Sequence, residues 1–288
     1  MRIVGWNIRA GGGQRVGMIA EQLDAWAPDI VALCEFRATP PSQCLADALA
    51  ARGLAFQEVA IDPHLPSRNG LLVASRWPLR RIKVAAAPLE PCRWLMVSIE
   101  APQPFTLGAM HIPLMTSGRK ESYLSSVERL VRGWRRGPAL LIGDTNSGRP
   151  EIDEESSVFG PRYTAWFDQF DKRGWADAYR HLHGDTRVYT WYSPNRGNGF
   201  RLDQAFVNRH LVPHLRHAGY VWGQPPDAIA GTNRTLLSDH AALLLDFDLA
   251  DDRHIQGAGE VSLEIDAAVN DHQVSNRRAT SSHDWPIT

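Results

Sequence analysis

The chain has 288 residues, of which 43% are hydrophobic, and its formal net charge at pH 7 is −1. This length and apolar content are sufficient for a large buried core. The sequence contains no run of about eighteen apolar residues, which excludes a membrane-spanning helix. The near-zero net charge excludes a global positive field that would attract a polyanion.

The N-terminal stretch and the cysteines favour a cytoplasmic protein. The stretch MRIVGWNIRAGGG has no apolar segment of the kind found in secretory signals, and its pattern is that of a first strand. The three cysteines, Cys34, Cys44 and Cys92, match neither a disulfide framework nor the spacing of a zinc site. We therefore expect a reducing, cytoplasmic environment.

Hydrophobic periodicity predicts strands and helices along the first 250 residues. In chain order we expect a strand at 2–8, a helix at 16–26, a strand at 29–35, a helix at 41–52, strands at 69–76, 81–86, 93–100 and 105–112, a helix at 118–136, a strand at 138–144, a helix at 162–174, and strands at 187–192, 201–208 and 240–247. We expect a single domain over 1–250. The polar, aperiodic tail over 251–288 is expected to be mostly disordered, with an edge strand as the alternative for 261–265.

The order of these elements predicts an α/β fold with mixed, mainly antiparallel sheets. The three connections within 69–112 are too short for a crossover helix, so these strands are expected to be antiparallel neighbours. Helices occur at intervals and not after every strand, which argues against a doubly wound parallel sheet. The glycines at 11–13 lack the spacing of a dinucleotide-binding loop.

Polar residues recur where an apolar strand meets a loop. They are Asn7, Glu35, His111, Asp144 with Asn146, Asp203, and Asp239 with His240. Each of them alone is explained by a turn, a helix cap or a satisfied polar contact. A buried carboxylate without a partner is costly, so the whole set indicates side chains that converge on one another and on a cation.

The set, in this order, resembles the endonuclease/exonuclease/phosphatase superfamily of divalent-metal phosphoesterases. The matching pieces are WNIR (6–9), CE (34–35), GDTN (143–146), RLDQAFV (201–207) and SDH (238–240). The resemblance covers residues 2 to about 247. It implies a four-layer sandwich, in which two mixed, mainly antiparallel sheets lie between helices, with the site at one end.

Within the superfamily, the segments 143–153 and 174–207 are similar to exonuclease-III-type abasic-site endonucleases. Two positions depart from that branch. His111 stands where the branch usually carries a tyrosine, and the residues after SDH lack its usual proline. A histidine at that position is usual in deoxyribonuclease-like and lipid-phosphatase-like branches.

The resemblance also assigns roles to the residues. Glu35 is the expected metal ligand, with Asn7 helping to hold the site and Asp239 binding directly or through water. Carboxylate and amide oxygens without a cysteine or histidine cluster suit Mg²⁺ or Mn²⁺ better than zinc. The expected cofactor is therefore Mg²⁺, with Mn²⁺ as the alternative.

The expected catalytic residues are Asp144, Asn146, His111, Asp203 and His240. Asp144 would orient and activate the attacking water, and Asn146 would donate a hydrogen bond to a phosphate oxygen. His240 would contact the scissile phosphate with its tautomer fixed by Asp203. His111 would contact the phosphate and help to protonate the leaving oxygen. Whether Asp144 or His240 is the general base is left open.

A local basic segment suggests where the substrate binds. Six arginines and five histidines lie between Arg180 and His217, opposed only by Asp185 and Asp203. We assign Arg196, Arg201 and Trp191 to substrate binding, Trp191 as an aromatic surface on which a base could stack. For Arg201 a structural ion pair is the favoured alternative.

These observations favour a metal-dependent nuclease acting on DNA, with abasic or 3′-blocked ends as candidate substrates. The first alternative is a phosphatase or phosphodiesterase acting on a small phosphorylated molecule or a lipid head group, which His111 favours. The second is a binding module without catalysis, which the complete polar set disfavours. A nucleic acid is the expected partner, and nothing in the sequence indicates an obligate protein partner.

Overall fold

The structure is a computed structural model that describes residues 1–224 and 236–249. The predicted tail at 251–288 and its alternative edge strand at 261–265 lie outside the described residues. No helix within the described ranges is both long and apolar enough to cross a bilayer.

The first sheet contains six strands in the order β13-β14-β1-β2-β4-β3. Their bounds are Arg2–Asn7 (β1), Ile30–Phe36 (β2), Phe56–Ala60 (β3), Gly70–Ser75 (β4), Leu215–Val221 (β13) and Ala242–Phe247 (β14). Strands β1 and β2 are parallel, and the chain crosses between them through helix α1 (Val16–Ala25). The other neighbouring pairs are antiparallel.

The second sheet contains six strands in the order β5-β6-β7-β8-β12-β9. Their bounds are Leu79–Arg81 (β5), Trp94–Ile99 (β6), Phe105–His111 (β7), Ala139–Asp144 (β8), Trp175–Asp177 (β9) and Asp203–Asn208 (β12). Only β7 and β8 are parallel, and helix α3 (Lys120–Gly133) connects them. Strands β10 (Trp191–Tyr192) and β11 (Gly199–Phe200) form a separate antiparallel pair.

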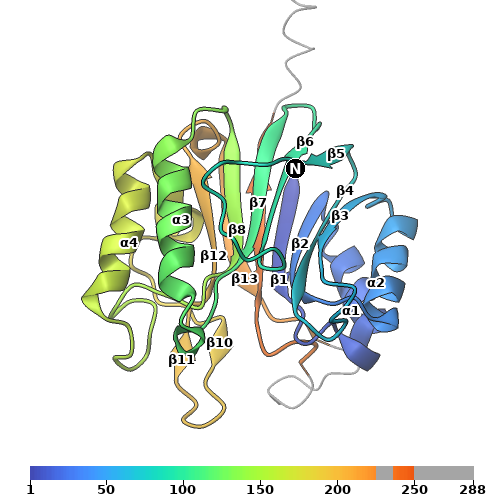
Figure 1. The fold of residues 1–288 in the computed structure, drawn as a ribbon, viewed down its shortest axis with the longest axis horizontal. Coiled ribbons are helices and arrows are strands. Elements are labelled where there is room, and N and C mark those ends of the chain that lie inside the picture. Colours follow the sequence, from blue (N-terminus) through green and yellow to red (C-terminus); the bar gives the residue numbers. More distant parts are fainter. Residues whose placement is uncertain (225–235, 250–288) are drawn as a thin grey trace, which may run out of the picture. The chain divides into compact units, whose positions relative to one another are not determined.

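The sheets pack face to face, and helices cover their outer faces (Figure 1). Helices α1 and α2 (Pro40–Ala51) lie over the first sheet, and α3 and α4 (Pro161–Lys172) lie over the second. The remaining elements are α5 (Ala178–His183) and the short 3₁₀ turns η1 (Gly13–Arg15), η2 (Met115–Ser117) and η3 (Val212–His214). The predicted four-layer sandwich of two mixed, mainly antiparallel sheets is confirmed.

Strands in this arrangement are buried on both faces, and their sequences show it. In β8, Leu140 and Ile142 pack into the core between the sheets, while Leu141 packs into the core under α3 and α4. In β1, Ile3 faces the core between the sheets and Val4 faces α1 and α2. The alternation of side chains along a strand therefore requires the continuous apolar runs that made these strands predictable.

The two parallel pairs determine where the polar residues meet. Parallel strands end at the same edge of a sheet, so the ends of β1 and β2 lie together, as do the ends of β7 and β8. The antiparallel strand β12 starts at that edge, where Asp203 is in register with Asp144. At the same edge the Cys34 thiol donates to the Met110 carbonyl across the sheets at 3.3 Å. The predicted site segments therefore share one end of the sandwich.

Several element predictions were wrong. The strand expected at 81–86 is limited to Leu79–Arg81, and that at 187–192 to Trp191–Tyr192. Strands β4 and β5 were expected to be antiparallel neighbours, but they belong to different sheets. The sequence analysis also missed β3, β9, β13 and α5. Strands β3, β9 and β13 lie at sheet edges, and β3 and β13 alternate weakly because their side chains are only partly buried.

Candidate active site

The first part of the site is a hydrogen-bonded group of three side chains from three strands. Asn7 at the end of β1 donates through Nδ2 to Asp144 Oδ2 at 3.0 Å and to Glu35 Oε1 at 3.4 Å. Its Oδ1 accepts from the Arg9 backbone N–H at 3.0 Å. The amide of Asn7 therefore holds two carboxylates from different sheets in a fixed relation.

A β-bulge in strand β2 sets the direction of the Glu35 side chain. The pairing of β2 with β4 shifts register between Cys34 and Phe36, and Glu35 has φ 63°. A non-glycine residue in the left-handed region is strained, and such residues concentrate at functional sites. The bulge turns the carboxylate out of the sheet, where Oε2 accepts from the Ala10 backbone N–H at 2.7 Å.

Asp144 is held at the end of a strand that approaches its neighbour closely. Gly143 has φ 148°, and a Cβ at this position would lie 1.9 Å from the Met110 carbonyl oxygen, so no other residue fits. Asp144 is 2% exposed, and its Oδ1 accepts from the Asn146 backbone N–H at 2.9 Å. Burial raises the pKa of Asp144, and the nearby His240 and His111 oppose this rise.

Asn146 lies in a rigid turn that follows Asp144. It has φ 46°, and its Nδ2 donates to the Ile112 carbonyl at 2.8 Å. The buried ammonium of Lys120, at the start of α3, donates to the Asn146 carbonyl. Burial lowers the pKa of Lys120 to about 8. The Ile112 carbonyl takes one of the two Nδ2 hydrogens of Asn146, so only the second could donate to a phosphate oxygen.

The second part of the site is a carboxylate–imidazole pair. His240 Nδ1 lies 2.9 Å from Asp203 Oδ2, and both side chains are buried. The segment that carries His240 is fixed to β1, because Trp6 Nε1 donates to the His240 carbonyl at 2.9 Å and Ser238 Oγ donates to the Asn7 carbonyl at 2.6 Å. Burial opposes the charged imidazole, but the carboxylates, Asp203 foremost, outweigh it and raise the pKa of His240 to about 10.

This pair predicts a stability that depends on pH. The folded pKa of His240, about 10, lies above its ordinary value of 6.5, so the pair contributes fully below about pH 6.5 and its contribution is lost as pH rises through about 10. We expect Asp203→Asn to lower the unfolding free energy more at pH 6 than at pH 10, as measured by urea unfolding in metal-free buffer. An equal loss at both pH values would contradict the charged pair.

His111 is neutral at physiological pH. Burial, aided by the charge of Arg93 and against that of Asp144, lowers the pKa of His111 to about 4. Its Nε2 lies 3.6 Å from Asp144 Oδ2, and its buried Nδ1 has no hydrogen-bond partner within the described part of the chain. A neutral imidazole is a weak proton donor, so the predicted role of His111 in protonating the leaving oxygen is not supported, whereas a contact with the phosphate is compatible with its position.

Most of these side chains border one cleft of about 480 Å³, whereas Asn7 and Asp203 do not line it and are hydrogen-bonded to Asp144 and His240, which do. Its polar side is formed by Glu35, His111, Asp144, Asn146, Asp239 and His240. Its other side is apolar and is formed by Leu114, Val158, Phe159, Trp191, Phe200 and Leu202. The arrangement places an uncharged, partly aromatic wall beside a group of carboxylates and imidazoles, which suits a ligand with one apolar and one anionic part.

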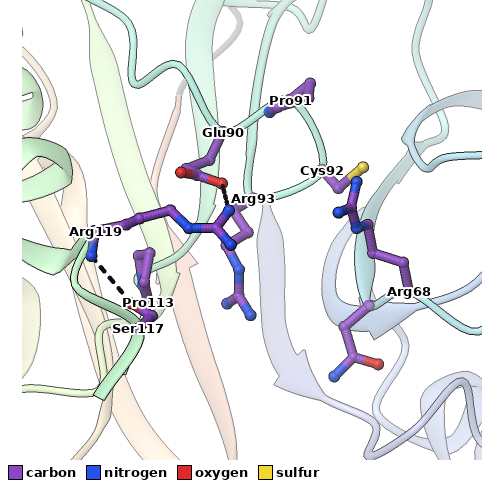
Figure 2. A pocket seen from close by; sticks show the side chains of 9 residues that line it. Arg68, Glu90, Pro91, Cys92, Arg93, Pro113, Ser117 and Arg119 are labelled. Atoms are coloured by element: carbon purple, nitrogen blue, oxygen red, sulfur yellow. Dashed lines mark hydrogen bonds and ion pairs between the residues drawn. The ribbon is translucent and has the colours of Figure 1, made fainter. Parts of the chain in front are cut away.

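A second, smaller pocket of about 140 Å³ adjoins the cleft, and Asn69 and Arg93 line both. Figure 2 shows the side chains of Arg68, Arg93 and Arg119 at this pocket, with Arg119 Nη1 paired to Glu90 Oε2 at 3.0 Å. Arg93 Nη1 donates to the His111 carbonyl at 3.3 Å, and Arg93 forms no ion pair within the described ranges. The pocket is therefore net positive and lies beside the catalytic candidates.

The structure corrects the assignment of Arg201 to substrate binding. Arg201 is 0% exposed, and its guanidinium pairs with Asp153 at 2.7 Å and with Asp177 at 2.6 Å. A side chain enclosed in this way cannot reach a substrate, and the alternative of a structural ion pair is the one observed. Trp191 lines the cleft. Arg196 is exposed in the turn between β10 and β11 and does not line it.

Three residues near the site were missed by the sequence analysis. Arg93 opens a predicted strand, but its position opposite His111 depends on the register of β6 and β7. Asn69 accepts from Arg37 Nε at 2.7 Å and stands at the start of another predicted strand. From the sequence, Lys120 is expected to be an ordinary exposed helix residue, but in the structure it is only 3% exposed. No local pattern distinguishes them, because each acquires its place through pairing or packing.

The oxygen atoms on the polar side fit a hard cation held by few protein ligands. Glu35 and Asp239 line the same cleft, and the only cation within ion-pair distance of Asp239 among the described residues is Arg9, whose Nε is 4.0 Å away. Among residues 1–224 and 236–249, no three His, Cys, Asp or Glu side chains are grouped closely enough to enclose an ion. Mg²⁺ is typically held by one or two carboxylates plus water and substrate phosphate, so the donor set is compatible with it.

Comparisons with known proteins agree with the fold and the order of these segments. Residues 4–240 match the model of the Endonuclease/Exonuclease/phosphatase family. A 3′-5′ exonuclease, NExo, from Neisseria meningitidis has a similar structure, with a TM-score of 0.68 and 21% sequence identity, and the similarity covers 86% of this chain and 100% of that one.

Two further structures are similar over the same share of each chain, 86% of this one and 100% of the other. One is the 3′ phosphatase NExo from Neisseria bound to a product DNA hairpin, with a TM-score of 0.66 and 20% identity. The other is an AP endonuclease from Archaeoglobus fulgidus, with a TM-score of 0.67 and 19% identity. At these identities the likeness shows the fold. No curated protein gives a significant match.

Proposed function

Because the chain belongs to the Endonuclease/Exonuclease/phosphatase family and is a phosphoesterase, we propose that it hydrolyses phosphodiester bonds of DNA with the help of a divalent cation. One observation carries the proposal. The hydrogen-bonded group Asn7–Glu35–Asp144 and the pair Asp203–His240 come from separate chain segments, and Glu35, Asp144 and His240 line a single cleft. Such convergence supports a catalytic centre in preference to a binding module, which would not require it.

The metal proposal rests on the oxygen-rich side of the cleft. Glu35 would hold the ion, with Asn7 fixing the carboxylate and Asp239 contributing directly or through water. A bound Mg²⁺ or Mn²⁺ supplies positive charge that neutralises the phosphate and stabilises the leaving oxygen. Asn7 is suited to its part because its Nδ2 reaches both Glu35 and Asp144.

The geometry supports Asp144 as the general base. His240 donates through Nδ1 to Asp203 and is held in the charged form, so it has no free lone pair for a proton of water. It can instead donate from Nε2 to a phosphate oxygen and stabilise negative charge there. Asp144 lines the cleft, and burial raises its pKa, which makes its carboxylate a stronger proton acceptor.

The cleft and its neighbouring pocket support a polynucleotide substrate. The apolar wall with Phe159, Trp191 and Phe200 suits a sugar or base beside the scissile phosphate. The pocket lined by Arg68 and Arg93 suits the next phosphate along a strand. Similar solved structures are described as an exonuclease, a 3′ phosphatase with DNA and an AP endonuclease, which favours DNA over RNA.

A second candidate is a phosphatase or phosphodiesterase acting on a small phosphorylated molecule or a lipid head group. The observation in its favour is His111, whose neutral imidazole lies at the cleft where the abasic-site branch usually carries a tyrosine. The two candidates share the catalytic group and differ in what the adjoining pockets bind.

We expect excess EDTA to abolish hydrolysis and Mg²⁺ or Mn²⁺ to restore it, because the carboxylates alone would repel a phosphodiester. The assay uses nicked DNA, abasic duplex, single-stranded DNA, RNA, inositol phosphate and sphingomyelin, each with Mg²⁺. The variant Glu35→Gln should need a higher Mg²⁺ concentration, whereas Glu121→Gln, on α3, should behave as wild type. Activity that persists in excess EDTA would contradict the proposed role of the metal. Hydrolysis of inositol phosphate and sphingomyelin alone would favour the second candidate.

A further inference from the structure

A groove of about 710 Å³ lies at the opposite end of the second sheet from the candidate active site. Six basic side chains line it, and we call it the distal basic groove. They are Arg132, Arg135, Lys172, Arg173, Arg209 and His210. They come from three segments that are far apart in sequence, namely the ends of α3 and α4 and the turn after β12.

The groove is separated from the catalytic cleft by the length of the sheet. Strand β8 runs from Ala139, next to the groove, to Asp144 in the cleft, and β12 runs back from Asp203 to Asn208 (Figure 1). Six strand residues span about 17 Å. A ligand in the groove therefore does not contact the residues proposed to carry out hydrolysis.

The groove is positively charged without compensation. No aspartate or glutamate lines it, and none of its six basic side chains forms an ion pair with a carboxylate of the described residues. Basic residues in the last turn of a helix often serve the helix dipole. The helix dipole explains the positions of Arg132 and Lys172, but it does not explain Arg209 and His210, which follow a strand.

The base of the groove holds its three segments in a fixed relation. The Gly137 carbonyl accepts from Asn208 Nδ2 at 2.7 Å and from Trp134 Nε1 at 2.9 Å. The Arg209 backbone N–H donates to the Gly174 carbonyl at 2.7 Å. The basic side chains therefore project from a rigid base, so their mutual spacing is set by the fold.

We propose that the distal basic groove binds the phosphate backbone of a nucleic acid. Its basic side chains are exposed and spread over three segments, which suits an extended polyanion and a sequence-independent, counterion-releasing contact. A site for a small polyphosphate would place buried polar groups around one point. A membrane surface is disfavoured because none of the large exposed apolar side chains among the described residues lines the groove.

This inference goes beyond the proposed function, since groove binding needs no hydrolysis. A strand held in the groove stays near the protein while the cleft at the other end engages a strand end. The contact should therefore strengthen binding of long nucleic acids and leave hydrolysis of short ones unchanged.

The test compares two triple variants that lose the same charge. The groove variant is Arg132→Gln/Arg135→Gln/Arg209→Gln, and the control is Arg52→Gln/Arg80→Gln/Arg216→Gln at exposed positions elsewhere. Each is combined with Asp144→Asn, so that binding of a labelled single-stranded 40-nucleotide DNA can be measured by fluorescence anisotropy without cleavage. Hydrolysis of a four-nucleotide substrate is measured with Asp144 intact.

We expect the groove variant to bind the long DNA at least tenfold more weakly than the control, with the slope of log K against log salt reduced by about two to three. Its kcat/KM for the four-nucleotide substrate should stay within twofold of wild type. Equal binding by the two variants would overturn the proposal, as would full competition by micromolar tripolyphosphate, or equal groove-dependent binding of anionic vesicles in place of DNA. If the groove variant binds more weakly than the control but the wild type hydrolyses no DNA, the groove proposal stands and only the proposed function is refuted.

Discussion

Asp144→Asn is expected to lower kcat for a phosphodiester substrate by about 10²–10⁴-fold, the contribution typical of a general base. The asparagine keeps the shape of the side chain but cannot accept a proton from water. In the wild type, Asn7 Nδ2 and the Asn146 backbone N–H each donate to one oxygen of Asp144. An asparagine has only one side-chain oxygen, so it can accept only one of these two hydrogen bonds in the same way. The loss should appear in single-turnover kinetics at saturating substrate and Mg²⁺.

The fold should tolerate this change. Burial raises the pKa of Asp144, which means that its charged form is not stabilised by the folded protein, and a neutral side chain of the same shape removes a buried charge. We expect the thermal transition to stay within a few degrees of wild type. Asp47→Asn, on the exposed face of α2, is the matched control and should change neither property. A variant that keeps more than about a tenth of the activity would rule out Asp144 as the base.

The burial of the strands on both faces explains why several residues of the candidate site could be singled out in the sequence. A strand buried on both faces accommodates polar side chains mainly at its ends, so Asp144 after Leu140–Ile142 and Asn7 after Ile3–Val4 differ visibly from the residues before them. The parallel pairs bring strand ends together within each sheet, and the packing of the two sheets brings Asn7 to Asp144. The contact proposed between Asp203 and His240 is present in the structure at 2.9 Å.

Other features depend on information that no single segment contains. The bulge that turns Glu35 outward arises in the pairing of β2 with β4. Arg93 gains its place beside His111 from the register of β6 with β7. The small second pocket and the distal basic groove are formed by segments far apart in the chain, so a run such as RLVRGWRRG in α3 and after it could not be distinguished from ordinary helix-end charges.

The arginine that was assigned to the substrate instead organises the scaffold behind Asp203. Arg201 Nε and Nη2 donate to Asp153 at 2.7 and 3.1 Å, and Nη1 and Nη2 donate to Asp177 at 3.1 and 2.6 Å. Asp177 also caps α5, because its Oδ1 accepts from the Tyr179 backbone N–H at 3.1 Å. Burial opposes ionisation of Asp153, but Arg201 outweighs it and lowers the pKa of Asp153.

Arg201→Met is therefore expected to lower the free energy of unfolding by about 3–5 kcal/mol, the usual cost of removing one partner from a buried ion pair. The methionine leaves Asp177 buried without a cation and Asp153 with Arg180 alone. By contrast, Arg187→Met, at an exposed position, should cost under about 0.5 kcal/mol. Urea unfolding at pH 7 measures both.

The double variant Arg201→Met/Asp177→Asn separates the effect of the ion pair from that of packing, because Asp153 also pairs with Arg180 whereas Asp177 has no second ion pair among the described residues. If the loss comes from a buried carboxylate without a cation, neutralising Asp177 should recover part of the stability that Arg201→Met removes. The lowered pKa of Asp153 gives the sign of the pH effect: its contribution is present above the ordinary carboxyl pKa and is lost as pH falls through the lowered value. The difference between wild type and Arg201→Met should accordingly shrink toward pH 3. A difference that is independent of pH, with no recovery in the double variant, would mean that Arg201 stabilises the fold by filling space and not by its charge.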